Sequence, residues 1–253
     1  MTGMIELDGG AFSAYRSDPE GPVRGAVIVI HEIWGLVDHI KNIADRFAGE
    51  GYIAIAPDLL TGVGIPPEVG LQLIPLMFET DDAKKSAAQP ILRDKLAPLH
   101  APEFGVWAVN ALRSVVDYLA EQREVGGDIA VVGYCFGGTY SFALAAADPR
   151  VRAAVPFYGQ PPETTEIAAI ACPVLALYGQ HDPSLIANLP AVTESMANAG
   201  VDFRAHVYPD AGHAFFNDTN PATYRADDAA DAWHRTLAFL SEPHAAPAAA
   251  VSP

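Results

Sequence analysis

The chain has 253 residues, of which 50% are hydrophobic and 18% are charged, and its formal net charge is −16. This length and composition are typical of a soluble α/β domain with a sizeable core. The acidic balance, with only 15 Lys and Arg, argues against a nucleic-acid partner and against an anionic membrane surface. The N-terminus lacks the pattern of a signal peptide and no apolar run is long enough to span a membrane, so we expect a cytoplasmic protein.

Strand and helix patterns alternate along most of the chain. The first segment, residues 4–16, alternates weakly between apolar and polar and predicts a hairpin or edge strands. Strand patterns follow at 27–30, 52–56, 128–133, 153–158, 174–178 and 203–208. Helical patterns lie between them at 39–50, 104–122, 136–147, 189–199 and 222–240. This alternation predicts an α/β fold with a mostly parallel sheet and helices on both faces.

One stretch, from residue 61 to residue 100, departs from this alternation. It carries five prolines, at positions 66, 67, 75, 90 and 98, with two short helix-like pieces between them. We expect an excursion over the top of the domain rather than a part of the sheet. The single domain is predicted to span residues 1–240, and the tail at 241–253, rich in Ala and Pro, is predicted to be disordered.

A thiol stands between a predicted strand and a predicted helix in the sequence GYCFG at residues 133–137. Gly-x-Cys-x-Gly at such a junction is the nucleophile-elbow pattern of α/β-hydrolases, with Cys135 in place of serine. The turn is tight, so a Cβ atom at either glycine would collide with the flanking strand and helix. The sulfur would lie at a helix N-terminus, which favours the thiolate. The other cysteine, Cys172, we interpret as buried packing.

The elbow requires an acid and then a histidine later in the chain, each just after a strand. Asp182 and His213 meet this requirement. Asp210 is a rival acid near the histidine, but only Asp182 follows the earlier strand, so we prefer Asp182. Cys135 would then be the nucleophile and His213 the general base, while Asp182 would fix the imidazole tautomer.

The segment HEIWG at residues 31–35 directly follows the most apolar strand. His-Glu is also part of the metalloprotease helix, but that motif needs a second histidine where this chain has Gly35, so we predict no metal and no cofactor. In the hydrolase fold, this loop supplies one of the two oxyanion donors. The backbone N–H groups of Ile33 and Phe136 are therefore the predicted oxyanion hole, and Glu32 is expected close to the elbow.

Several motifs together resemble the dienelactone hydrolase family, over nearly the whole chain from about residue 5 to residue 240. They are HEIWGL, PDLL at 57–60, GYCFGG, GQHD at 179–182 and AGHAFFN at 211–217. The resemblance implies the α/β-hydrolase fold, the triad Cys135, His213 and Asp182, and the same oxyanion hole. It also implies that Glu32 contacts the resting thiol and, displaced by substrate, helps to form the thiolate.

The resemblance also suggests residues that contact substrate. In the family's type member, two arginines bind the substrate's carboxylate, one of them four residues after the catalytic histidine. Asn217 occupies that position in this chain, and Arg93 is a candidate for the other arginine. Trp34 and Tyr158 are further candidates for the pocket wall, although Tyr158 fits equally well as a packing aromatic at a strand end.

We therefore expect a hydrolase of small-molecule esters or lactones that acts through a thioester at Cys135. A thiolate leaves more readily than an alkoxide, so lactones and enol esters with good leaving groups suit this nucleophile best. The alternative is a non-catalytic protein that binds a small molecule on the same fold, although a pure binder has no need of Asp182 and His213. The sequence leaves the oligomeric state open.

Overall fold

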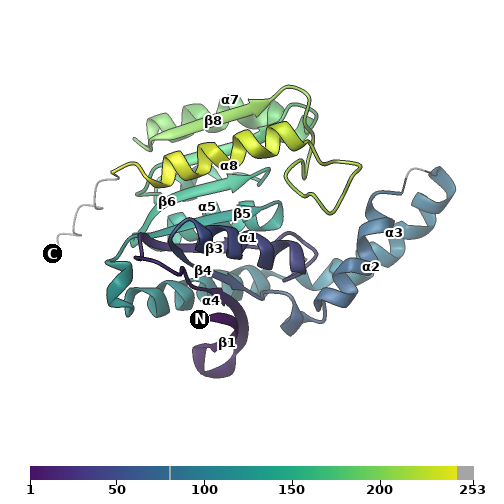
Figure 1. The fold of residues 1–253 in the computed structure, drawn as a ribbon. Helices are drawn as coiled ribbons and strands as arrows, with labels where there is room; N and C mark the ends of the chain where they lie inside the picture. Colours follow the sequence, from purple (N-terminus) through teal and green to yellow (C-terminus); the bar gives the residue numbers. More distant parts are fainter. Residues whose placement is uncertain (80, 244–253) are drawn as a thin grey trace.

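Eight strands form one sheet in the order β1-β2-β4-β3-β5-β6-β7-β8 (Figure 1). The structure is a computed structural model and describes residues 1–79 and 81–243. Strands β1 and β2 pair antiparallel, as do β2 and β4, and all other neighbours are parallel. The predicted α/β-hydrolase fold with a mostly parallel sheet is confirmed. The strands are β1 (Thr2–Leu7), β2 (Phe12–Ser17), β3 (Gly25–Ile30), β4 (Tyr52–Pro57), β5 (Ile129–Tyr134), β6 (Val151–Phe157), β7 (Val174–Gly179) and β8 (Phe203–Tyr208).

The core lies around the central strands. Every residue of β3, β4, β5 and β7 is buried, because helices cover both faces of this part of the sheet. In contrast, β8 exposes part of its length at the edge of the sheet. The continuous apolar sequences of the central strands are the expected consequence of burial on two sides, and they leave polar side chains only where the strands end.

The helices form two layers. They are α1 (Asp38–Gly49), α4 (Pro102–Ala120), α5 (Phe136–Ala147), the short α6 (Thr164–Ile167), α7 (Pro183–Asn198) and α8 (Ala226–Leu240). On the near face in Figure 1, α1 packs on α8 through Phe47 and Trp233, whose ring centroids are 4.6 Å apart. On the far face, α4 packs on α5 through Phe104 and Tyr140, at 6.3 Å.

Two helices begin elsewhere than the sequence patterns indicate. The helix expected over 189–199 starts six residues earlier, at Pro183, because proline is well suited to a first helical position and Pro190 inside the helix does not end it. The helix expected over 222–240 starts only at Ala226, because the preceding residues form turns in which the Thr223 N–H donates to the Asn220 carbonyl.

The proline-rich stretch 61–100 contains α2 (Pro67–Met77) and α3 (Asp82–Leu96), which project beyond the carboxyl ends of the parallel strands (Figure 1). Helix α2 meets the loop after β3 so closely that a Cβ atom on Gly70 would lie 2.0 Å from the carbonyl oxygen of Trp34. The ring of Phe78 packs on the Trp34 indole, with centroids 6.2 Å apart. The excursion therefore contacts the loop that carries the candidate oxyanion donor.

Most of the tail that we predict to be disordered, residues 244–253, lies outside the described residues. At its start, the Ser241 N–H still donates to the Leu237 carbonyl of α8, and Glu242 forms an ion pair of 2.8 Å with Arg204 on β8. Within the described ranges, no helix is long and apolar enough to cross a membrane.

Candidate active site

Cys135 lies on a strained turn between β5 and α5. Its backbone has φ 55° and ψ −113°, a combination that residues other than glycine rarely adopt. A Cβ atom on Gly133 would lie 2.0 Å from the Gly137 carbonyl oxygen, and one on Gly137 would lie 2.2 Å from the carbonyl oxygen of Ile30. Both glycines are thus required by close backbone approach, and the turn has the geometry of a nucleophile elbow.

The three side chains of the predicted triad meet at the carboxyl ends of β5, β7 and β8. The Nδ1 atom of His213 lies 2.5 Å from Oδ2 of Asp182, and the thiol of Cys135 interacts with the same imidazole. Burial lowers the pKa of His213, but hydrogen bonds with Asp182 and then Cys135 outweigh it and raise the pKa to about 10. Because Nδ1 faces the carboxylate, Nε2 is the nitrogen left for the thiol.

Of the two candidate acids, the structure brings Asp182 to the imidazole. Asp182 is buried directly after β7 and precedes α7, whereas Asp210 is exposed and offers only its backbone carbonyl, to Arg225. The turn after His213 is tight, with Ala214 at a φ of 60°. Asp182 therefore has the position that a third triad member needs, next to the nitrogen that does not face the nucleophile.

Glu32 is a buried carboxyl group, 1% exposed, at the end of β3. The Asn217 amide donates to one of its oxygens at 2.5 Å, and the Tyr158 hydroxyl donates to the other at 3.3 Å. Burial raises the pKa of Glu32 to about 7, although both hydrogen bonds and the charge of His213 oppose this shift. Among the described residues, Glu32 has no hydrogen bond to Cys135, whose thiol interacts with His213 instead.

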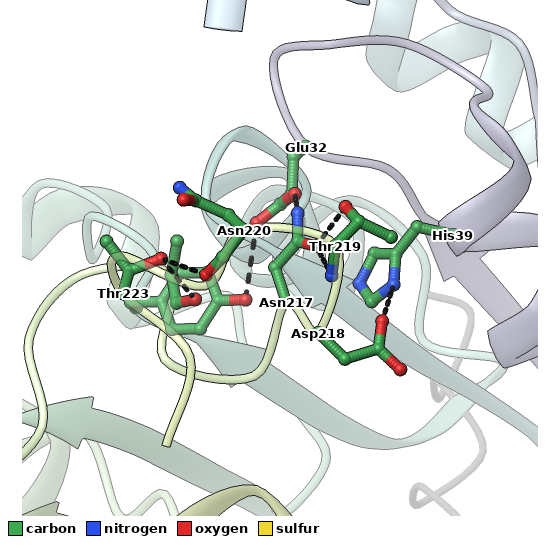
Figure 2. A network of polar contacts seen from close by, with 9 residues as sticks. Glu32, His39, Asn217, Asp218, Thr219, Asn220 and Thr223 are labelled. Carbon is green, nitrogen blue, oxygen red and sulfur yellow. Dashed lines mark hydrogen bonds and ion pairs between the residues drawn. The ribbon is translucent and has the colours of Figure 1, made fainter. Parts of the chain in front are cut away.

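Asn217 is oriented by the loop that follows His213 (Figure 2). The backbone N–H and the hydroxyl of Thr219 donate to the amide oxygen of Asn217, at 3.0 and 2.6 Å, so the amide nitrogen faces Glu32. Next to it, Asp218 lies 3.0 Å from Nδ1 of His39 at the start of α1. The loop after His213 is thereby held by hydrogen bonds to both α1 and Glu32.

These contacts give the predicted substrate residues different positions. Asn217 is 3% exposed and hydrogen-bonds Glu32, a pairing that sequence reasoning missed, although a buried carboxylate always needs a partner. Tyr158 is buried between Glu32 and His213, and its ring centroid lies 5.0 Å from that of His213.

The other two candidates make no hydrogen bond to Glu32 or His213 among the described residues. Trp34 is buried against Phe78. Arg93 is exposed on α3 and has no hydrogen bond or ion pair with Glu32 or the triad within the described ranges.

The two predicted oxyanion donors have no hydrogen-bond partner among the described residues. Within residues 1–79 and 81–243, neither the Ile33 N–H nor the Phe136 N–H has a hydrogen bond. The segments that carry them touch, because Gly137 packs directly on the backbone of Ile30 and His31. A pair of free N–H groups beside a nucleophile is the arrangement that stabilises an oxyanion.

Within the described residues, Cys172 and the metal-binding types of side chain form no second site. Cys172 is buried, and burial raises the pKa of its thiol to about 12, so it stays protonated at neutral pH. Within the described part of the chain, no three His, Cys, Asp or Glu side chains are grouped so that they could hold a metal ion.

Known proteins share this architecture. The family model of the dienelactone hydrolase family matches residues 12–243. A protein of Saccharolobus solfataricus named "Putative carboxymethylenebutenolidase" is 34% identical over 258 residues, an alignment that covers 93% of this chain and 95% of the relative. One of the same name from Escherichia coli is 32% identical, over 94% of this chain and 85% of the relative.

A solved structure is similar over nearly its full length. It is the crystal structure of a "Putative Dienelactone Hydrolase" from Klebsiella pneumoniae, which is 28% identical and superposes with a TM-score of 0.78, covering 96% of this chain and 98% of that chain. The family match spans the elbow, both loops that carry the candidate acid and base, and the loop after β3. From its sequence and its fold alike, the chain belongs to the dienelactone hydrolase family of α/β-hydrolases.

Proposed function

We propose that this protein hydrolyses an ester or lactone bond of a small molecule, with Cys135 as the nucleophile, His213 as the base and Asp182 as its orienting acid. The observation that supports the proposal is the hydrogen bond between Asp182 and His213 next to the strained elbow, whose Cys135 thiol helps to raise the pKa of the same imidazole. The names of the relatives, carboxymethylenebutenolidase and dienelactone hydrolase, are those of lactone hydrolases and support the same reaction class.

In the proposed reaction, the Cys135 sulfur attacks the carbonyl carbon of the substrate as a thiolate, while Nε2 of His213 holds its proton. The electron pair of the carbonyl moves to its oxygen, which accepts hydrogen bonds from the N–H groups of Ile33 and Phe136. When this intermediate collapses, the C–O bond breaks and the leaving oxygen takes the proton from His213. A water molecule, deprotonated by His213, then attacks the thioester carbonyl carbon. The C–S bond breaks, the carboxylic acid product leaves, and His213 returns its proton to the sulfur.

The surroundings of His213 favour its charged form in this cycle. Asp182 bonds the imidazole directly, and the buried carboxylate of Glu32 attracts it electrostatically. An imidazolium with a pKa of about 10 is a weak acid, so it assists the departure of a poor leaving group only slightly. Enol lactones and aryl esters, whose leaving groups need little protonation, are therefore the favoured substrates.

The charge around the site favours a neutral acyl group. Within the described ranges, no Lys or Arg side chain bonds Glu32, Asp182 or His213, and the position of a family arginine is occupied by Asn217, which bonds Glu32. The net charge of −16 gives no long-range attraction for an anion. We therefore propose uncharged lactones and esters over carboxylated ones.

The test compares hydrolysis of p-nitrophenyl acetate and of an enol lactone by wild type, Cys135→Ala and Cys172→Ala. We expect the Cys135→Ala variant to lose activity, the Cys172→Ala control to keep it, and mass spectrometry of the wild type to detect an acyl group on Cys135. Full activity in Cys135→Ala would refute the nucleophile. Equally slow alkylation of both cysteines by iodoacetamide, with no turnover of any ester, would instead support a non-catalytic binding protein.

A further inference from the structure

His31 is a buried histidine beside the site that the proposed reaction does not use. It is fully buried at the end of β3. Its Nδ1 atom lies 2.7 Å from the carbonyl oxygen of Glu32, and its Nε2 atom lies 3.1 Å from the backbone nitrogen of Leu59, in the loop after β4. Both ring nitrogens therefore have one defined partner each.

These two partners fix the protonation of the ring. The Leu59 N–H can only donate, so Nε2 of His31 must be the accepting nitrogen of a neutral imidazole. The proton then resides on Nδ1 and is donated to the Glu32 carbonyl. Burial lowers the pKa of His31, which keeps the ring in this neutral form at neutral pH.

On the basis of the proposed function, we propose that His31 is a positioning residue for the oxyanion hole. Its Nδ1–H, together with the Gly35 N–H at 3.1 Å, holds the carbonyl of the peptide that joins Glu32 to Ile33. In a planar trans peptide the N–H points opposite to the carbonyl. By holding the oxygen on one side, His31 directs the unpartnered Ile33 N–H to the other side, away from the imidazole.

The same imidazole also contacts the second half of the hole. Its ring stacks on that of Phe136, with centroids 5.6 Å apart and planes 4° from parallel. Phe136 supplies the other proposed donor through its backbone. On its other side, the His31 ring accepts from the Leu59 N–H. Leu59 lies in a turn in which the Asp58 carboxylate accepts from the N–H groups of Leu60 and Thr61. The His31 side chain thus contacts both segments that carry the proposed donors.

Two substitutions of His31 distinguish the effect of its Nδ1–H donor from the effect of its stacked ring. His31→Phe keeps a ring to stack on Phe136 but has no N–H for the Glu32 carbonyl. His31→Asn loses the ring but places an amide N–H near the former Nδ1 position. Neither variant has an acceptor at the Nε2 position for Leu59, so the destabilisation from that loss is common to both.

We expect kcat for p-nitrophenyl acetate to fall about 10- to 100-fold in His31→Phe, while KM changes little. This loss is smaller than that on removing an oxyanion donor, because the Ile33 N–H is still present. His31→Asn should recover most of the lost kcat. Alkylation of Cys135 by iodoacetamide needs the thiolate but no oxyanion hole, so its rate should match wild type in both variants. Equal loss of kcat in both variants, following their melting temperatures, would overturn the proposal.

A measurement on wild type covers the case in which a variant does not fold. A long-range ¹H–¹⁵N NMR spectrum at neutral pH should show His31 as the neutral tautomer with the proton on Nδ1. An Nε2–H tautomer or an imidazolium would refute the positioning role. If the proposed function is wrong, the result is different: the wild type lacks esterase activity, while the His31 ring still carries its proton on Nδ1.

Discussion

Glu32 gives the structure a definite dependence of stability on pH. Its pKa of about 7 in the folded state compares with an ordinary value of 4.5, and a buried carboxyl group gains this shift from loss of hydration. Between these two pKa values the folded state holds a proton that the unfolded state has released. Raising the pH through this window therefore removes stability from the wild type.

The magnitude follows from the shift. The shift from 4.5 to about 7 corresponds to about 3 kcal/mol over the whole window, most of which falls between pH 5 and pH 8. Glu32→Gln keeps the size of the side chain and cannot ionise. We expect the free energy of unfolding of this variant, relative to wild type, to rise by about 2 to 3 kcal/mol from pH 5 to pH 8.

Urea denaturation at pH 5, 6, 7 and 8 measures this difference. Glu121→Gln, at the exposed end of α4, is the matched control and should show a constant difference from wild type. A difference for Glu32→Gln that stayed flat within about 0.5 kcal/mol over the same range would refute the reasoning, because it would mean that Glu32 titrates alike in the folded and unfolded states.

Three further changes test the rest of the site. Asp182→Asn should lower kcat by about 10³- to 10⁴-fold, because the imidazole loses its orienting acid; a loss below tenfold in steady-state kinetics would contradict this role. Gly137→Ala forces a Cβ atom to within 2.2 Å of a carbonyl oxygen and should lower stability by about 3 kcal/mol or more in thermal denaturation, whereas Gly49→Ala, with no atom within 4 Å, should change it by less than about 1 kcal/mol. Asn217→Leu removes a donor to Glu32, so ¹³C NMR should show the Glu32 carboxyl titrating at higher pH than in wild type; an unchanged titration would contradict the pairing.

The sequence predicted the elements that depend on local pattern. Uninterrupted apolar strands, the glycines at 133 and 137 and the order of thiol, acid and histidine are all properties of short segments, and the structure joins those segments as the α/β-hydrolase fold requires. Helix boundaries were less accurate. Prolines 183 and 190 lie within one helix, where the local pattern indicated a later start.

Contacts between distant segments could not be predicted in the same way. The burial of Glu32 was foreseeable from its place after an apolar strand, but its partner Asn217 is 185 residues away. Likewise, the two hydrogen bonds of His31 depend on where β4 ends in space. A histidine next to a glutamate indicates either a ligand or a packing residue until the backbone groups around it are known.

The close backbone contact between α2 and the loop after β3 has a consequence for enzyme engineering. Gly70 of α2 meets the Trp34 carbonyl with no room for a side chain, whereas much of α3 is exposed. Mutant libraries intended to broaden substrate range can therefore randomise the outward positions of α3 with little penalty. Position 70 should remain glycine, because any larger residue would shift the loop that carries the proposed oxyanion donor, the Ile33 N–H.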